Sequence, residues 1–271
     1  MNLPELSPRF YLFNGTFAYF GKSIDTDFHA HHALQVCLSL TTPFIIETEK
    51  EQGEHMYFII NSDENHRFDG LDGWHLILLM DPEHVLADAV KHRAGLINSA
   101  SQDLDELGPL VEDLVEDLVG LMIANKGCSK VIRSLDHLLA CLSGSVVNTR
   151  ETDERIQKIF DYIAGLEEKK AGLAELARLV NLSESRLAHI FKDQVGIPLR
   201  RFLLWARMMA TLKSVIHTRS LTEAAMNAGF SDSAHFTRTF RQMFGVTPSV
   251  YLKNLKGSRF IQAMDCMGVI E

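Results

Sequence analysis

The chain has 271 residues, of which 46% are hydrophobic and 23% are charged, and its formal net charge at pH 7 is −8. This length and composition predict a globular protein with room for two domains. No run of about eighteen apolar residues occurs and no secretory signal pattern is present, so we expect a cytoplasmic protein that does not enter a membrane. The four cysteines lack CxxC spacing, which predicts free thiols in a reducing compartment and argues against a cysteine metal site; they are Cys37, Cys128, Cys141 and Cys266.

Charge is divided unequally along the chain. Residues 1–150 carry 10 Lys and Arg against 22 Asp and Glu, a net charge of −12, whereas residues 151–271 carry 17 against 13, a net charge of +4. Such asymmetry suggests a nucleic-acid-binding module joined to an acidic partner domain.

The first part of the chain reads as β-structure. Short apolar runs alternate with polar or glycine-containing turns such as Glu51–Glu54, and this spacing predicts a small sandwich or barrel over residues 1–98. The expected strands are Phe10–Phe13, Phe17–Phe20, Leu34–Leu40, Phe44–Thr48, Met56–Ile60 and Trp74–Met80.

Histidines gather in this region. His29 and His31 would share one face of a strand, and His66 ends a later run. Imidazoles suit Zn, Cu, Fe or Ni. This histidine pattern resembles the metal motif of cupins, which has a glutamate about where this chain has Gln35, a neutral and poor ligand. We therefore expect no metal and no cofactor, with His29, His31 and His66 as the ligand set if a metal bound.

A small barrel can also enclose one ligand, which predicts a pocket for a small-molecule effector. For each aromatic residue, ordinary core packing is the alternative. The residues proposed to line the pocket are Tyr11, Phe13, His31, Gln35, Tyr57 and His66.

Helical periodicity follows. Asp81-Pro82 begins a helix that continues over Glu83–Leu96, and apolar residues recur at heptad-like spacing over Leu104–Ile123. A partner helix is predicted at Val131–Ser143, after a turn at Asn125–Gly127. The hairpin over residues 99–150 either forms a dimer interface, which we favour, or packs on its own barrel. Residues 144–152 are the best linker candidate.

The last part of the chain repeats one unit. In residues 221–251 a short apolar stripe is followed by Gly229, a turn that can take positive φ, and by a helix with Phe236, Phe240 and Phe244 on one face. The same pattern occurs in residues 173–199, and each unit reads as a helix–turn–helix. Between the units, Leu199–His217 contains no Gly or Pro and predicts one helix of about 28 Å.

The run AGFSDSAHFTRTFRQMFGVTPSVY closely resembles the signature of the AraC/XylS family of transcription regulators. This resemblance covers roughly residues 153–256. It implies an α+β protein with a cupin-like N-terminal barrel and, over residues 151–257, an all-α DNA-binding domain with helix–turn–helix motifs at 173–194 and 221–244. The tail at 258–271 has no assigned role.

The resemblance also implies which side chains meet DNA. We expect base reading from Ser185, Ala188, His189, Ser233, Ala234, His235 and Arg238. Arg238 should be the strongest reader, because arginine binds guanine O6 and N7 together. The expected phosphate contacts are Arg186, Lys192, Arg200, Arg201, Arg219 and Arg241.

The sequence therefore predicts an effector-controlled, sequence-specific DNA-binding regulator. By the family resemblance it is an activator and a homodimer that contacts operator DNA and RNA polymerase, and it is no enzyme. A metal-dependent cupin enzyme with a DNA-binding tail is the alternative, which the lack of a convergent carboxylate pair disfavours.

Overall fold

A computed structural model describes residues 8–13, 16–22, 25–95, 101–103, 108–124, 128–144, 153–166, 168–218 and 220–250. The chain divides into two compact units: Met1–Thr149 with Arg241–Glu271, and Arg150–Phe240. The predicted linker at 144–152 lies outside the described residues except for Gly144. The tail at 258–271 and the predicted domain boundary at residue 98 lie outside them as well.

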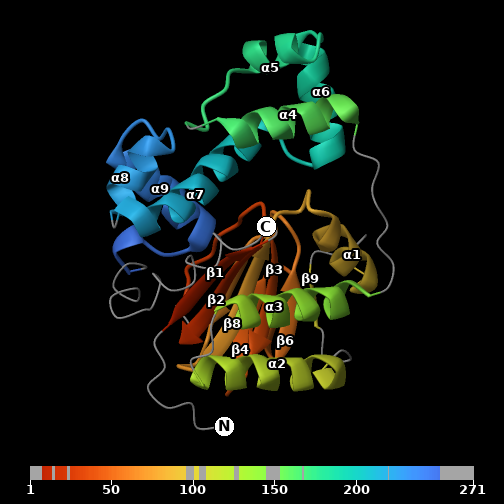
Figure 1. Cartoon of the computed structure of the whole chain (residues 1–271), viewed down its shortest axis with the longest axis vertical. Helices are drawn as coiled ribbons and strands as arrows, with labels where there is room; N and C mark the ends of the chain where they lie inside the picture. The colour runs from red at the N-terminus through yellow and green to blue at the C-terminus, as the bar shows by residue number, and fades with distance from the viewer. Residues whose placement is uncertain are drawn as a thin grey trace. The chain divides into compact units, whose positions relative to one another are not determined.

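The N-terminal unit contains two antiparallel sheets (Figure 1). The larger has the strand order β1-β2-β8-β3-β6-β9, and the smaller has the order β5-β4-β7. The strands are β1 (Arg9–Phe13), β2 (Thr16–Lys22), β3 (Leu34–Ser39), β4 (Phe44–Thr48), β5 (Gln52–His55), β6 (Tyr57–Ile60), β7 (His66–Asp69), β8 (Trp74–Met80) and β9 (Ser101–Asp103). The two antiparallel sheets agree with the predicted small sandwich or barrel.

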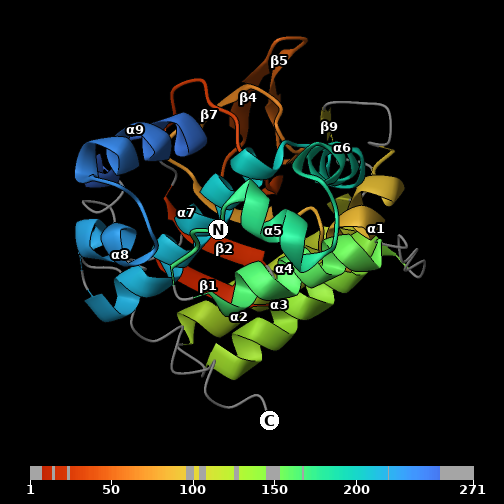
Figure 2. The ribbon, with the colours of Figure 1, turned by 90° about the horizontal axis from the view of Figure 1, so that it is seen from above.

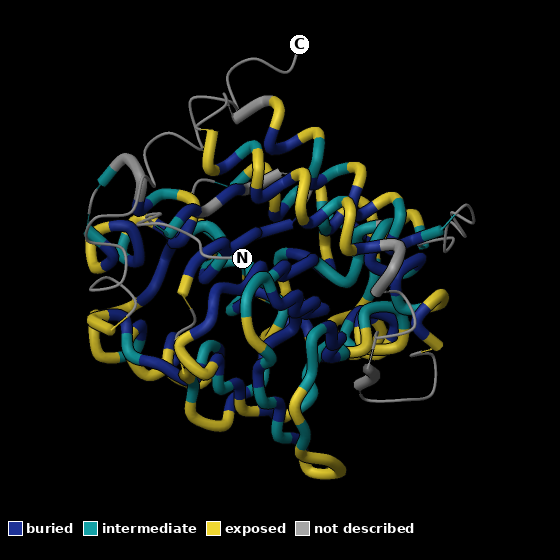
Figure 3. The backbone as a smooth tube through the Cα atoms, turned by 90° about the horizontal axis from the view of Figure 1, so that it is seen from below, coloured by how far each residue is buried: buried dark blue, intermediate teal, exposed yellow. Residues whose placement is uncertain are grey.

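The central strands of the larger sheet are buried on both faces, which explains their continuous apolar sequences. On β3, Val36 and Leu38 belong to a core shared with helices, while Cys37 belongs to a second core with Phe44 and Phe68 of the smaller sheet. Figure 3 shows long buried stretches of backbone between the exposed ones. The unit is therefore built in three layers: helices, the six-stranded sheet and the three-stranded sheet.

The helical layer consists of α1 (Val85–Arg93), α2 (Gly108–Ile123) and α3 (Cys128–Ser143). Figures 1 and 2 show α2 and α3 running side by side along the sheet. Their apolar faces are part of the same core as the sheet, through Val111, Val115, Leu118, Val119 and Met122 of α2 and Val131, Leu135, Leu138, Leu139 and Leu142 of α3. The hairpin thus packs on its own sheet, and the dimer interface stays a prediction.

Several details of the predicted β-structure were wrong. Glu51–Glu54 was expected to be a turn, but Gln52–His55 forms the edge strand β5. Strands β7 and β9 were not predicted, because short, polar edge strands lack an apolar run. His29 makes only an isolated bridge to His66, and His31 lies outside any strand. Leu104, Leu107 and the turn at 125–127 lie outside the described residues.

The second unit is helical. Its elements are α4 (Glu154–Gly165), α5 (Leu173–Leu179), α6 (Glu184–Val195), α7 (Leu199–Thr218) and α8 (Leu221–Asn227), followed by α9 (Ser233–Phe244), of which the residues up to Phe240 belong to this unit. As predicted, α5–α6 and α8–α9 form two short-helix, longer-helix pairs, and α7 is one continuous helix of 20 residues. The α+β class follows from the two units together.

The two helix–turn–helix turns use the same backbone device. Asn181 has φ 55° and Gly229 has φ 99°, which allows each chain to reverse between its helices. Equivalent backbone bonds close both turns, from Leu182 N–H to the carbonyl of Ala177 and from Phe230 N–H to the carbonyl of Ala225. The turn residues therefore set the angle at which each second helix is presented.

Candidate nucleic-acid interface and sensing domain

The helix α6 separates an apolar face from a polar one. Leu187, Ile190 and Phe191 are buried in the core that α4, α5 and α7 share. The Ser183 hydroxyl caps the helix by accepting a bond from Arg186 N–H at 3.3 Å. The polar face leaves four of the predicted DNA-contacting residues exposed, and they are Ser185, Arg186, His189 and Lys192.

The helix α9 is built in the same way around aromatic rings. Phe236 stacks edge-on against Phe230 at 5.4 Å and against Phe240 at 5.7 Å between ring centroids. The Asp232 carboxylate accepts a bond from His235 N–H at 2.7 Å, and this bond lowers the pKa of Asp232. Four predicted DNA-contacting residues are exposed on the opposite face: Ser233, Ala234, Arg238 and Arg241.

His235 differs from the other predicted base readers. It is half-buried, its ring lies 5.4 Å from the ring of Phe230, and its Nδ1 lies 3.2 Å from Ser231 Oγ. These contacts are local to the turn. His235 therefore helps to hold the start of α9, and its freedom to reach a base is restricted.

Aligning the two helix–turn–helix motifs by their buried residues reveals a residue that sequence reasoning missed. Phe236 takes the place of Leu187 and Phe240 that of Phe191, so Thr237 corresponds to Ala188. Thr237 is exposed between Ala234 and Arg238. The spacing between equivalent residues of the two motifs can be counted in the sequence, and this count would have identified Thr237.

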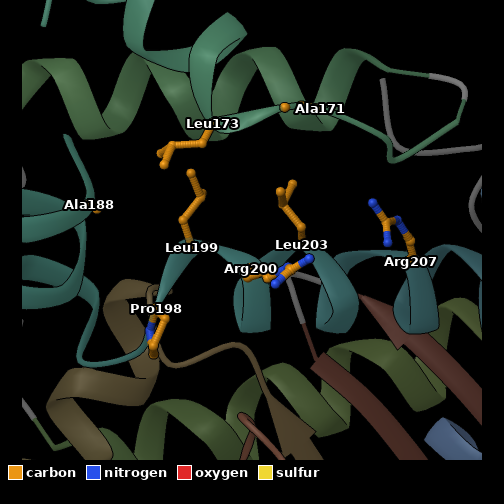
Figure 4. A pocket seen from close by; sticks show the side chains of 9 residues that line it. Ala171, Leu173, Ala188, Pro198, Leu199, Arg200, Leu203 and Arg207 are labelled. Carbon is orange, nitrogen blue, oxygen red and sulfur yellow. The ribbon is translucent and has the colours of Figure 1, made fainter. Parts of the chain in front are cut away.

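Ala188 and Arg200 lie beside a cavity of about 650 Å³ within this unit. Figure 4 shows Leu199 and Leu203 of α7 directed toward Leu173, with Arg207 further along the helix. The Arg207 guanidinium donates to the carbonyl of Lys169 at 2.8 Å. The half-buried Ala188 therefore faces this cavity in part, and Arg200 flanks it.

Of the three remaining predicted phosphate contacts, the structure describes two. Arg200 and Arg201 are exposed on the first turn of α7. Arg219 lies outside the described residues. Because α7 has 20 residues, its length is about 30 Å, close to the roughly 34 Å of one DNA turn.

The predicted effector pocket does not form as one site. Tyr11 and Tyr57 pack in the core between the larger sheet and the helices. Gln35 alternates with Val36 on β3 and lies on the other face of the sheet, where its amide contacts Cys37 Sγ at 3.1 Å. The side chain of Phe13, on β1, lies outside the part of the chain that the structure describes. The larger sheet therefore separates the two tyrosines from Gln35.

His29, His31 and His66 do come together. One ring nitrogen of each lies within 4.8 Å of one ring nitrogen of each of the others, and all three residues are buried. His29 and His66 exchange two backbone hydrogen bonds of 2.9 Å, which places them directly opposite each other. His31 Nε2 lies 2.8 Å from Gln35 Oε1. The fold thus assembles the predicted ligand set even though His31 is not in a strand.

Burial keeps these imidazoles neutral. It lowers the pKa of His29 to about 3, with a further contribution from His31. Burial is also the main cause that lowers the pKa of His31 and of His66. Neutral imidazole is the form that binds a metal.

Comparison with known proteins supplies relatives for the helical part. The family model described as a helix-turn-helix domain matches residues 176–254. A probable transcriptional regulator, LumQ of Photobacterium leiognathi, is 23% identical over 232 residues, which cover 83% of this chain and 91% of LumQ. An uncharacterized HTH-type transcriptional regulator of Staphylococcus aureus is 31% identical over 100 residues, which cover 36% of this chain but only 13% of that relative.

Solved structures share the fold at low sequence identity. ToxT from Vibrio cholerae matches with a TM-score of 0.56 and 13% identity, over 89% of this chain and 98% of ToxT. ToxT bound to an unsaturated fatty acid matches with a TM-score of 0.54 and 12% identity, over 89% of this chain and 95% of that one. In the part of the chain that the structure describes, no helix has both the length and the hydropathy to cross a membrane.

Proposed function

We propose, from the premise that this chain is an AraC-family transcription regulator, that it reads two adjacent segments of operator DNA with α6 and α9 under the control of a small-molecule effector. The observation that carries the proposal is the pair of helices with buried apolar backs and exposed polar fronts, joined by one helix of about a DNA turn in length.

Each reading helix has a different chemical capacity. In α9, Arg238 offers a fork of donors that matches guanine O6 and N7, and Thr237 beside it offers a hydroxyl and a methyl group. In α6, Ser185 and His189 form fewer strong bonds. We therefore assign most of the sequence discrimination to α9, while Lys192 and Arg241 hold phosphates.

The N-terminal unit is the proposed sensor. Its three-layer core is distinct from the helical unit, and its net negative charge over residues 1–150 is unsuited to DNA. ToxT has been solved with a fatty acid bound, which supports an effector for a protein of this fold. An effector can act only if it binds one arrangement of the chain more tightly than another.

The remaining assignments complete the proposal. We place the protein in the cytoplasm as a homodimer that contacts RNA polymerase and activates transcription, and we assign it no enzymatic activity. The match to regulators supports the absence of catalysis. Because the α2–α3 hairpin already packs on its own sheet, a dimer would have to use the outer faces of these helices.

Selection of random duplex DNA on the purified full chain, at moderate salt, tests the reading mode. We expect two short conserved blocks about one helical turn apart. Selection should be repeated with Arg238→Ala, and with Arg178→Ala as a control that removes an exposed charge of α5, outside the two reading helices.

Arg238→Ala should weaken binding to the selected site by about 1–3 kcal/mol and relax the preference at one base pair. Arg178→Ala should leave the selected sequence unchanged. Enrichment of a single block, or the same consensus for Arg238→Ala and the parent protein, would contradict the proposal.

A further inference from the structure

The three buried histidines share one hydrogen-bonding pattern. The Nδ1 atom of each faces a backbone carbonyl oxygen: that of Asp27 at 2.9 Å for His29, of Ala33 at 3.1 Å for His31 and of Glu64 at 2.9 Å for His66. Carbonyl oxygens only accept hydrogen bonds, so each Nδ1 carries the proton. The lone pair of every ring is therefore on Nε2.

The protein encloses the three rings. His29, His31 and His66 are only 6%, 3% and 1% exposed. The Nε2 atom of His66 is buried without a hydrogen-bond partner among the described residues. Burying a polar atom without a hydrogen-bond partner costs free energy of folding. A group that accepts the lone pair of His66 Nε2 would remove this cost.

The Gln35 amide lies beside the same site. Its Oε1 lies 2.8 Å from His31 Nε2, so two lone-pair atoms face each other when Nδ1 carries the proton. Either the amide is flipped and donates to His31, or a cation lies beside both atoms.

We propose that His29, His31 and His66 form a three-histidine site for a divalent first-row transition metal such as Zn²⁺, with Gln35 beside the fourth coordination position. Imidazole nitrogens bind these metals at about 2.0–2.1 Å, so ligand atoms within 4.8 Å of one another need only a small contraction. The three backbone carbonyls on Nδ1 are the outer contacts that orient metal-binding histidines.

The site would tie two parts of the N-terminal unit together. His66 belongs to β7 of the smaller sheet, whereas His29 and His31 lie in the segment before β3 of the larger sheet. A bound ion would fasten that segment to β7. This inference concerns the N-terminal unit alone and does not depend on the proposed DNA binding.

Titration of the metal-free full chain with Co²⁺ tests the site, because cobalt in a nitrogen-rich site gives visible ligand-field bands. We expect saturation at one equivalent and displacement of cobalt by Zn²⁺. His66→Asn keeps a side-chain N–H for the carbonyl of Glu64 but removes the Nε2 ligand, so its affinity should fall about 100-fold. His92→Ala, which removes an exposed imidazole of α1, should bind like the parent chain.

Gln35→Glu provides a result that misfolding cannot mimic. A carboxylate at this position adds a charged ligand beside His31, so Co²⁺ affinity should rise at least about tenfold. Zn²⁺ should also raise the melting temperature of the parent chain but not that of His66→Asn. Absence of cobalt bands in folded protein, equal binding by His66→Asn, or an intense near-ultraviolet band from cysteine thiolate would overturn the proposal.

Discussion

His32 differs from its neighbours because it is buried as a charged group. Its Nε2 lies 2.6 Å from Glu83 and its Nδ1 3.3 Å from Asp63. Burial alone would lower the pKa of His32, but the bonds to Asp63 and Glu83 outweigh it and raise the pKa to about 9. The triad joins the loop after β6 to the residues that precede α1. Sequence reasoning did not single out His32 for this role.

We predict that His32→Ala lowers the free energy of unfolding by about 1–3 kcal/mol at pH 7. The mutation leaves two partly buried carboxylates without their cation, which costs less than in a fully buried pair. Because the pKa of His32 is raised on folding, its stabilisation is fully present below its ordinary value of 6.5 and is lost as the pH rises through about 9.

Urea unfolding of the parent chain and His32→Ala at pH 6, 7 and 9.5 measures this effect. The difference between the two should shrink at the highest pH. His137→Ala, which removes an exposed histidine of α3, serves as the control. A difference that stayed constant across the pH range would show that the charge of His32 is not responsible.

At the level of elements, the two helix–turn–helix motifs have different residues at the left-handed position of their turns. The left-handed turn position is Asn181 in the first motif and Gly229 in the second. Glycine takes this conformation without strain, and asparagine tolerates it better than other side chains. A Cβ at Gly229 would also approach Lys170 Cγ to 2.9 Å, so the lysine would have to move.

We therefore predict that Gly229→Ala destabilises the helical unit by about 1 kcal/mol or more, which lowers the melting temperature of this unit by about 4–8 °C. Asn181→Gly should be close to neutral, because it only relieves strain at the equivalent position. Thermal unfolding followed by circular dichroism compares the two. Equal melting temperatures for Gly229→Ala and the parent chain would mean that the turn tolerates a side chain.

At the level of the whole molecule, α7 sets the distance between the reading helices. A single helix of 20 residues is stiff, so the two helices cannot adapt freely to a changed spacing. We predict that inserting 5 base pairs between the two operator blocks reduces affinity to that of one block, because half a turn of DNA places the second block on the opposite side.

Electrophoretic mobility shifts with the selected operator and the lengthened one test this prediction. A spacer of unchanged length but different sequence should bind like the parent operator. Unchanged affinity after the insertion would mean that the two helices do not read the same face of the DNA together.

The sequence by itself determined the helical unit almost completely. Its helices are local structures, so apolar periodicity, capping residues and the turn at Gly229 predicted α7 and both helix–turn–helix motifs. Buried Leu187, Phe191, Phe236 and Phe240 were assigned correctly for the same reason. The likeness between the two motifs predicted two reading helices, although their alignment was not carried as far as Thr237.

Only the tertiary structure decided how the N-terminal residues are grouped. Strand pairing joins residues that are far apart in the chain, and a single apolar run does not say which face of a sheet it covers. For this reason Tyr57 was predicted beside Gln35 but lies on the other side of the sheet. The pairing of His29 with His66 likewise comes from two backbone bonds across 37 positions of sequence, and it brings together the three imidazoles that the sequence had named only as a ligand set.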